Sequence, residues 1–129
     1  MSTKQNNTKI ILLVDNEPDN TSVLSMGLED EGFRVDSFND PMLALSRFIP
    51  NFYSLLILDI NMPKMNGYEL YNEIRKVDAK VKICFLTGSE LCLETLRRPT
   101  VDFDANCLIS KPLSIEDLVR KVKRQIEPQ

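Results

Sequence analysis

Residues 55–59 read Leu-Leu-Ile-Leu-Asp, a run of four bulky apolar side chains that ends on a carboxylate. Such a short, unbroken run predicts a β-strand buried on both faces, because a strand with one wet face would alternate apolar and polar residues. Residues 10–14 (Ile-Ile-Leu-Leu-Val) form a second run of this kind, and Asp15 follows it. Strands of this type are typical of a parallel sheet covered by helices on both faces.

Three further segments have the pattern of strands: residues 33–38, 81–86 and 107–110. The first of them alternates apolar and polar side chains, so we place it nearer an edge of the sheet. Helix-like patterns separate the strands. We expect the first helix to begin near Pro18 and to end at Gly32, since proline suits the first helical position and glycine the residue just beyond a helix.

Four more helices are expected. The second follows residue 40, a short fourth one covers about residues 89–97, and the fifth begins at Ser114, whose hydroxyl can cap it. Apolar side chains at spacings of four and three should form the buried face of the third helix; these are Leu70, Ile74 and Val77.

The strand–helix unit therefore occurs five times. Alternation of this kind predicts parallel strands joined by right-handed crossovers. We predict one α/β domain over residues 9–127, with a doubly wound, flavodoxin-like (βα)5 architecture, strand order 2-1-3-4-5 and helices on both faces of the sheet. Residues 1–9 are polar and are expected to be a disordered tail.

Composition excludes several classes of function. The 129 residues carry 16 Lys and Arg against 19 Asp and Glu, a net charge of −3, so we do not expect this domain to bind nucleic acid. The apolar runs are far too short to span a membrane. The chain has no histidine, which rules out Ser-His and Cys-His nucleophile pairs and excludes the chain as a histidine phosphodonor.

The three cysteines do not form the paired spacing of a disulfide framework or a zinc site. We expect them to be reduced, with Cys84 and Cys107 as small core residues, and the protein to be cytoplasmic.

Polar side chains come directly after each of the strong strands. In a doubly wound sheet, the carboxyl ends of the strands share one edge, and ligands bind there. Four polar clusters should therefore meet: Asp15-Asn16-Glu17, Asp59, Thr87-Gly88 and Lys111-Pro112.

These clusters have a common chemistry. Carboxylate and amide oxygens suit Mg²⁺, which prefers one or two carboxylates together with water and phosphate oxygens. A carboxylate can be the nucleophile that accepts a phosphoryl group. A lysine ammonium and a threonine hydroxyl can hold phosphate oxygens. Phosphoryl transfer depends mainly on positioning and on charge neutralisation, so this set of groups would suffice.

Four segments resemble the motifs of response-regulator receiver domains of the chemotaxis-regulator-like superfamily. The segment around the strand-end aspartate, residues 58–67 (Leu-Asp-Ile-Asn-Met-Pro-Lys-Met-Asn-Gly), is similar to the sequence around their phosphoacceptor. Residues 11–17, 85–88 and 109–112 resemble the acidic first loop and the two remaining motifs. The resemblance covers roughly residues 9–127.

The resemblance implies a role for each matching residue. Asp59 would be the phosphoacceptor and a metal ligand, and Asp15 would act on Mg²⁺ through water. The backbone carbonyl of Asn61 would bind the metal. Lys111 would pair with the phosphoryl group, and Thr87 would supply the switch hydroxyl. The following Lys-Pro bond would be cis, as is typical of the family.

Two positions depart from the family pattern. Asn16 stands where a second acidic metal ligand is usual; its amide oxygen can coordinate, but one negative charge is lost, so we expect weaker Mg²⁺ binding. Leu108 stands where an aromatic switch residue is common, so an aromatic rotamer change cannot report phosphorylation here.

The function implied by the resemblance is a phosphorylation-dependent switch in a two-component phosphorelay. A histidine kinase or histidine phosphotransfer protein would phosphorylate Asp59 with Mg²⁺ as cofactor. The aspartyl phosphate would alter the surface of the fourth helix, fifth strand and fifth helix toward an unknown target. The chain would assist its own phosphorylation and dephosphorylation without being a turnover enzyme.

Three alternatives stay open. Asn16 and Leu108 would suit a pseudo-receiver that binds partners without being phosphorylated. A haloacid-dehalogenase-type phosphatase also uses a strand-end aspartate, but it usually has a second aspartate where this chain has Asn61. A flavodoxin is disfavoured because no Ser/Thr/Gly-rich phosphate loop follows the first strand.

Overall fold

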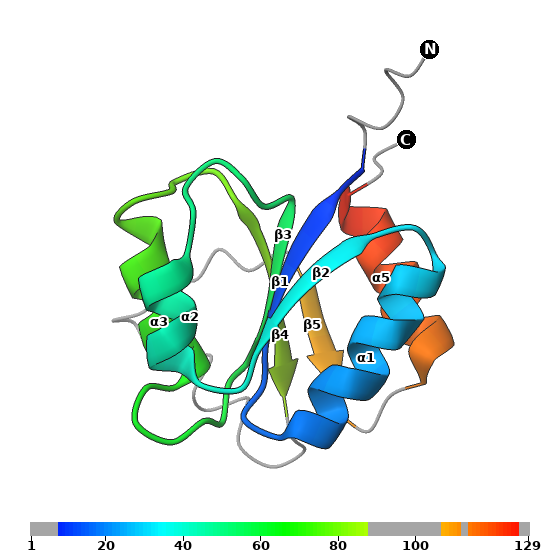
Figure 1. The fold of residues 1–129 in the computed structure, drawn as a ribbon, viewed down its shortest axis with the longest axis horizontal. Coiled ribbons are helices and arrows are strands. Elements are labelled where there is room, and N and C mark those ends of the chain that lie inside the picture. Colours follow the sequence, from blue (N-terminus) through cyan, green and yellow to red (C-terminus); the bar gives the residue numbers. More distant parts are fainter. Residues whose placement is uncertain (1–7, 88–106, 112–113, 127–129) are drawn as a thin grey trace.

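A five-stranded parallel sheet forms the centre of the molecule (Figure 1). The computed structural model describes residues 8–87, 107–111 and 114–126. The strands are β1 (Ile10–Val14), β2 (Arg34–Phe38), β3 (Leu55–Asp59), β4 (Lys82–Thr87) and β5 (Cys107–Ser110). Their order is β2-β1-β3-β4-β5 and every neighbouring pair is parallel, which confirms the predicted doubly wound topology.

Helices cover both faces of this sheet. They are α1 (Pro18–Asp30), α2 (Pro41–Arg47), α3 (Gly67–Arg75) and α5 (Ile115–Ile126). Figure 1 shows α1 and α5 on one face and α2 and α3 on the other. The helix predicted for residues 89–97 and most of the predicted N-terminal tail lie outside the described residues.

The helix starts follow from local side-chain chemistry. Proline occupies the first turn of α1 and of α2. At α3, the side chain of Asn66 accepts a hydrogen bond from the backbone N–H of Glu69, whose carboxylate accepts from the backbone N–H of Asn66. At α5, the predicted cap is present: the hydroxyl of Ser114 accepts from the backbone N–H of Asp117 at 3.1 Å.

The central strands separate two apolar cores. All five residues of β3 are buried, as the unbroken run predicts. One core lies between the sheet and the α2–α3 layer, and the other lies between the sheet and the α1–α5 layer. Because β3 supplies side chains to both cores, its carboxyl end is held firmly at the sheet edge.

Two expectations are wrong. Val77 does not lie on the buried face of the third helix, because α3 ends at Arg75 and the Val77 side chain is 56% exposed. Cys84 is fully buried, as predicted, but it is disulfide-bonded rather than reduced. Its register partner across the β4–β5 pair is Cys107.

None of the described helices combines the length and apolar character that a bilayer crossing requires.

Candidate phosphoacceptor and metal site

The structure brings together three of the predicted site residues at the carboxyl edge of the sheet. The Nζ atom of Lys111 lies 3.1 Å from Oδ2 of Asp59 and 3.2 Å from Oδ2 of Asp15. Asp15 follows β1, and Asp59 is the last residue of the neighbouring strand β3. Asp15 is 0% exposed and Asp59 is 3% exposed. A single ammonium group therefore bridges two nearly buried carboxylates that come from distant parts of the sequence.

Asp15 is held by the loop that enters α1. Its Oδ1 accepts a hydrogen bond from the backbone N–H of Glu17 at 3.0 Å. Its Oδ2 accepts from Nδ2 of Asn20 at 3.3 Å, and its backbone carbonyl accepts from Nδ2 of Asn39 at 2.7 Å. Asn20 also donates to Oε1 of Glu17. Sequence reasoning missed Asn20 and Asn39. The position of Asn20 in the first turn of α1, five residues after Asp15, was a usable signal.

Asp59 is fixed by the turn that follows β3. Its Oδ1 accepts from the backbone N–H of Asn61 at 3.2 Å. The backbone of Ile60 is held on both sides, since its N–H donates to Leu86 of β4 and its carbonyl accepts from Gly67 at the start of α3. A Cβ atom on Gly67 would lie 2.5 Å from the backbone oxygen of Asp59. This close approach requires glycine, and sequence reasoning gave Gly67 no role.

Thr87 ends β4 beside the Lys111 segment. Its backbone carbonyl accepts from the N–H of Lys111 at 2.8 Å, which ties the ends of β4 and β5 together. The Thr87 residue is 4% exposed. Thr87 thus lies at the predicted edge of the sheet, while Gly88 and Pro112, and with them the predicted cis bond, lie outside the described residues.

The two departures from the family pattern differ in their surroundings. Asn16 is half-buried next to Asp15, and within the described ranges its side chain makes no hydrogen bond. Leu108 is 38% exposed on β5. Its backbone carbonyl accepts a 3.4 Å hydrogen bond from Nζ of Lys121 on α5. The structure therefore places Asn16 at the site and Leu108 on the outer surface.

Burial and charge shift the pKa values of the bridged groups. Desolvation, reinforced by the negative charge of Asp15, raises the pKa of Asp59 to about 6, although Lys111 and the N–H of Asn61 oppose this shift. Burial lowers the pKa of Lys111, but the two carboxylates outweigh burial, and the net pKa is raised. The ammonium is therefore charged at neutral pH, and Asp59 is a carboxylate only above about pH 6.

This pKa predicts a pH-dependent effect of the Asp59→Asn substitution in metal-free buffer. The folded protein holds the Asp59 proton up to about pH 6, whereas the unfolded chain releases it near pH 3.8. Between these values the native state binds more protons, so its unfolding free energy falls as pH rises. Above this window the substitution should stabilise the protein by up to about 2–3 kcal/mol. Urea unfolding of both proteins across the window measures the difference, and a difference independent of pH would contradict the shift.

The residues present fit a hard cation with few protein ligands. Over residues 8–87, 107–111 and 114–126, no three His, Cys, Asp or Glu side chains are grouped as a metal cluster. The site offers instead two carboxylates, from Asp15 and Asp59, with Asn16 and the Asn61 segment beside them. Mg²⁺ matches such a set, because it usually keeps several waters and takes one or two carboxylates plus phosphate oxygens.

Comparison with known proteins agrees with this fold. Residues 11–123 match the family model of the response regulator receiver domain. The chain therefore belongs to the response regulator receiver domain family, whose members are signalling modules of two-component systems.

Similar proteins include short and long relatives. The CpxR homolog of Haemophilus influenzae, a transcriptional regulatory protein, is 35% identical over 113 residues, which are 88% of this chain and 48% of that protein. The response regulator receiver protein CpdR of Brucella abortus is 32% identical over 119 residues, 92% of this chain and 97% of CpdR. The chain thus spans about half the length of the first relative and nearly all of the second.

Solved structures of one response regulator are also similar. TrrA of Thermotoga maritima, in complex with Mg²⁺-BeF, is 34% identical with a TM-score of 0.78 over 92% of this chain and 99% of TrrA. In a second structure, histidine kinase ThkA is in complex with TrrA; there the identity is 33% and the TM-score 0.77, over 93% of this chain and 100% of the matched chain.

Proposed function

We propose that this protein is a phosphorylation-dependent switch in which Asp59 accepts a phosphoryl group with Mg²⁺ as cofactor. One observation carries the proposal: the ammonium of Lys111 lies within 3.2 Å of carboxylate oxygens of both Asp15 and Asp59. The Lys111 ammonium holds the two carboxylates close enough together to share one cation. It is also placed to pair with phosphate oxygens.

The chemistry assigns one role to each group. An oxygen of Asp59 attacks the phosphorus of a phosphohistidine, the phosphorus–nitrogen bond breaks, and the imidazole leaves with the electron pair and takes up a proton. Mg²⁺, held by Asp15, Asp59 and the Asn61 carbonyl, would neutralise charge on the phosphoryl oxygens. Lys111 would exchange its carboxylate contact for a phosphoryl oxygen.

The hydroxyl of Thr87 would complete the phosphoryl site, as the resemblance implies. Asn16 lies next to Asp15 and can add an amide oxygen to the metal. Thr87 ends β4, which pairs with the strand that carries Leu108 on its exposed surface. Movement of the Thr87 end toward the phosphoryl group would therefore be transmitted to the β5–α5 surface, where we place the output.

The proposed phosphodonor is a histidine kinase or a histidine phosphotransfer protein. The complex of TrrA with a histidine kinase supports this partner class. A pseudo-receiver is the second candidate, because the site has two carboxylates where family members usually have three. The cytoplasmic location stays a prediction, and a stable disulfide at Cys84 would be unusual in that compartment.

Phosphorylation by a small donor separates these candidates. Incubation with acetyl phosphate and Mg²⁺ should add one phosphoryl group to the intact protein, and removal of Mg²⁺ with EDTA should prevent the addition. A phosphatase would instead release many phosphates per protein molecule. No mass gain at any Mg²⁺ concentration would favour the pseudo-receiver.

Restoring the missing charge should strengthen metal binding. We expect Asn16→Asp to tighten Mg²⁺ binding at pH 7.5 by about tenfold, which corresponds to ~1.4 kcal/mol, because a third carboxylate would face the cation. The measurement is a Mg²⁺ titration followed by NMR or calorimetry. Asn72→Asp on α3 is the matched control, since it adds the same charge away from Asp15. Equal or weaker binding in Asn16→Asp would contradict a metal role for position 16.

A further inference from the structure

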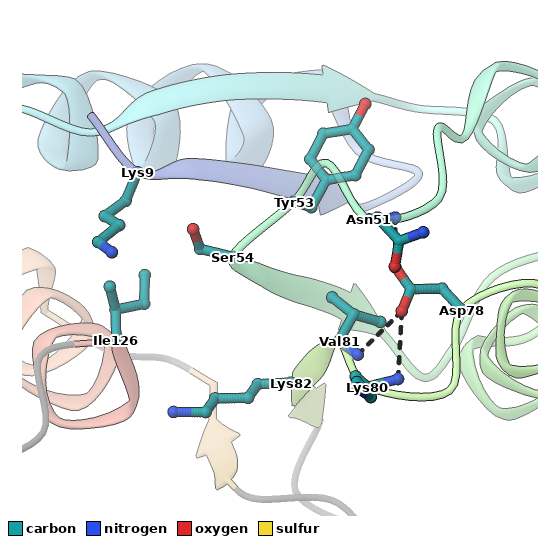
Figure 2. A pocket seen from close by; sticks show the side chains of 9 residues that line it. All are labelled: Lys9, Asn51, Tyr53, Ser54, Asp78, Lys80, Val81, Lys82 and Ile126. Atoms are coloured by element: carbon teal, nitrogen blue, oxygen red, sulfur yellow. Dashed lines mark hydrogen bonds between the residues drawn. The ribbon is translucent and has the colours of Figure 1, made fainter. Parts of the chain in front are cut away.

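A polar pocket of about 360 Å³ opens where the parallel strands begin, at the end of the sheet opposite the phosphoacceptor site (Figure 2). Its walls come from the residues just before or at the start of β1, β3 and β4 and from the last residue of α5. The lining residues are Lys9, Asn51, Tyr53, Ser54, Asp78, Lys80, Val81, Lys82 and Ile126. Because β3 runs from this pocket to Asp59, the two sites are separated by a strand of about 16 Å.

One buried carboxylate builds the rim of this pocket. Asp78 is 4% exposed. Its Oδ2 accepts from the backbone N–H of Asn51 at 2.9 Å, and its Oδ1 accepts from those of Lys80 and Val81 at 3.1 and 3.2 Å. Asp78 thereby joins the loop before β3 to the loop before β4. Asn51 adopts a left-handed φ of 62°, which asparagine tolerates better than most residues.

The pocket contains hydrogen-bond donors that have no partner in the described part of the chain. These are the ammonium groups of Lys9 and Lys80, the hydroxyl of Ser54 and the side-chain amide of Asn51. Lys82 adds a third ammonium, which donates to the backbone carbonyl of Gln125 at 2.6 Å. Figure 2 shows Lys9 and Ser54 directed into the open space between β1, β3 and the end of α5.

The charge of the pocket is opposite to that of the whole chain. Three lysines line it against one carboxylate, whose oxygens already accept three backbone N–H groups, whereas the net charge of the protein is −3. Val81 and Ile126 add buried apolar side chains to the lining, and the hydroxyl of Tyr53 donates to Asp36. The groups free to meet a ligand are therefore two ammonium groups, a hydroxyl and an amide, and all of them can donate to an anion.

We propose that this pocket binds a small polyanion carrying two or more phosphate or carboxylate groups, with Lys9, Lys80 and Ser54 as its donors. The Lys82 ammonium contributes charge while it stays on the α5 carbonyl. The volume suits an anion of the size of pyrophosphate or citrate. This site shares no residue with the phosphoacceptor site, so the failure of one proposal would leave the other unaffected.

The test is an NMR titration of the amide signals with inorganic pyrophosphate and, separately, with citrate. The buffer is freed of divalent cations by a chelating resin, and its ionic strength is held constant. We expect saturable shifts at Asn51, Ser54 and residues 80–82. If only pyrophosphate produces these shifts, the ligand carries phosphate groups. If only citrate produces them, the ligand carries carboxylate groups.

Two charge-matched double variants decide whether binding is specific. Lys9→Gln with Lys80→Gln should weaken the affinity at least fivefold, and Ser54→Ala alone should weaken it measurably. Lys64→Gln with Arg120→Gln removes the same charge from exposed positions outside the pocket and should leave the affinity unchanged. Three results would each overturn the proposal. The first is equal weakening in both double variants, the second is shifts confined to Asp59 and Lys111, and the third is the lack of saturable shifts.

Discussion

Replacement of Asp59 by asparagine is expected to abolish phosphorylation by acetyl phosphate completely. The amide is nearly isosteric with the carboxylate, but it has no charged oxygen that can attack phosphorus. The side chain should keep its place, because the amide oxygen can still accept one of the two present hydrogen bonds, from the ammonium of Lys111 or from the backbone N–H of Asn61. Intact-mass spectrometry of the variant with saturating Mg²⁺ and donor is the measurement.

Asp30→Asn is the matched control for this experiment. Asp30 is an exposed residue at the end of α1, and its replacement removes the same charge. The control should gain one phosphoryl group as the wild type does. Undiminished phosphorylation of Asp59→Asn would show that another residue is the acceptor. Loss of phosphorylation in both variants would show that the net charge, and not the nucleophile, is decisive.

Replacement of Gly67 by alanine is expected to destabilise the protein by about 2–3 kcal/mol, in addition to slowing phosphorylation. The new Cβ would lie 2.5 Å from the backbone oxygen of Asp59 and 3.0 Å from Cα of Ile60. Both are backbone atoms, so neither can move aside without shifting the phosphoacceptor turn. Alanine favours helices over glycine by up to about 1 kcal/mol, so a net loss would report the clash itself.

Gly32→Ala separates this clash from backbone strain. Gly32 has a φ of +96°, which alanine adopts at a cost of about 1–2 kcal/mol, but a Cβ there would contact no atom within 4 Å. Gly32→Ala should therefore unfold at lower urea concentration while it is phosphorylated at the wild-type rate. Gly67→Ala should be impaired in both measurements. A Gly67→Ala protein as stable as the wild type would contradict the close approach of α3 to the Asp59 turn.

The fold was predictable because its two central strands have an unambiguous composition. The apolar runs at residues 10–14 and 55–58 are too short for helices and too uniform for a sheet with one wet face. The site followed from the same assignment, because parallel strands bring their carboxyl ends to one edge. Asp15, Asp59 and Lys111 could thus be placed together before any distance was known.

The supporting residues were not predictable from a single sequence. Asn39 reaches the backbone of Asp15 from the end of β2, and Asp78 joins two loops through three N–H groups. Such contacts join segments that no periodicity relates. Val77 had the spacing of a helical face, but α3 ended before it. The disulfide at Cys84 could not be foreseen, because the three cysteines lack the paired spacing of a disulfide framework.

A crystal structure with Mg²⁺ and beryllofluoride, a mimic of the phosphoryl group, tests the central claim most directly. We predict beryllium bound to an oxygen of Asp59, Mg²⁺ held by Asp15, Asp59 and the Asn61 carbonyl, and the Lys111 ammonium on a fluoride. Beryllofluoride bound away from Asp59, or a Lys111 that stays on both carboxylates beside an empty metal site, would contradict the account.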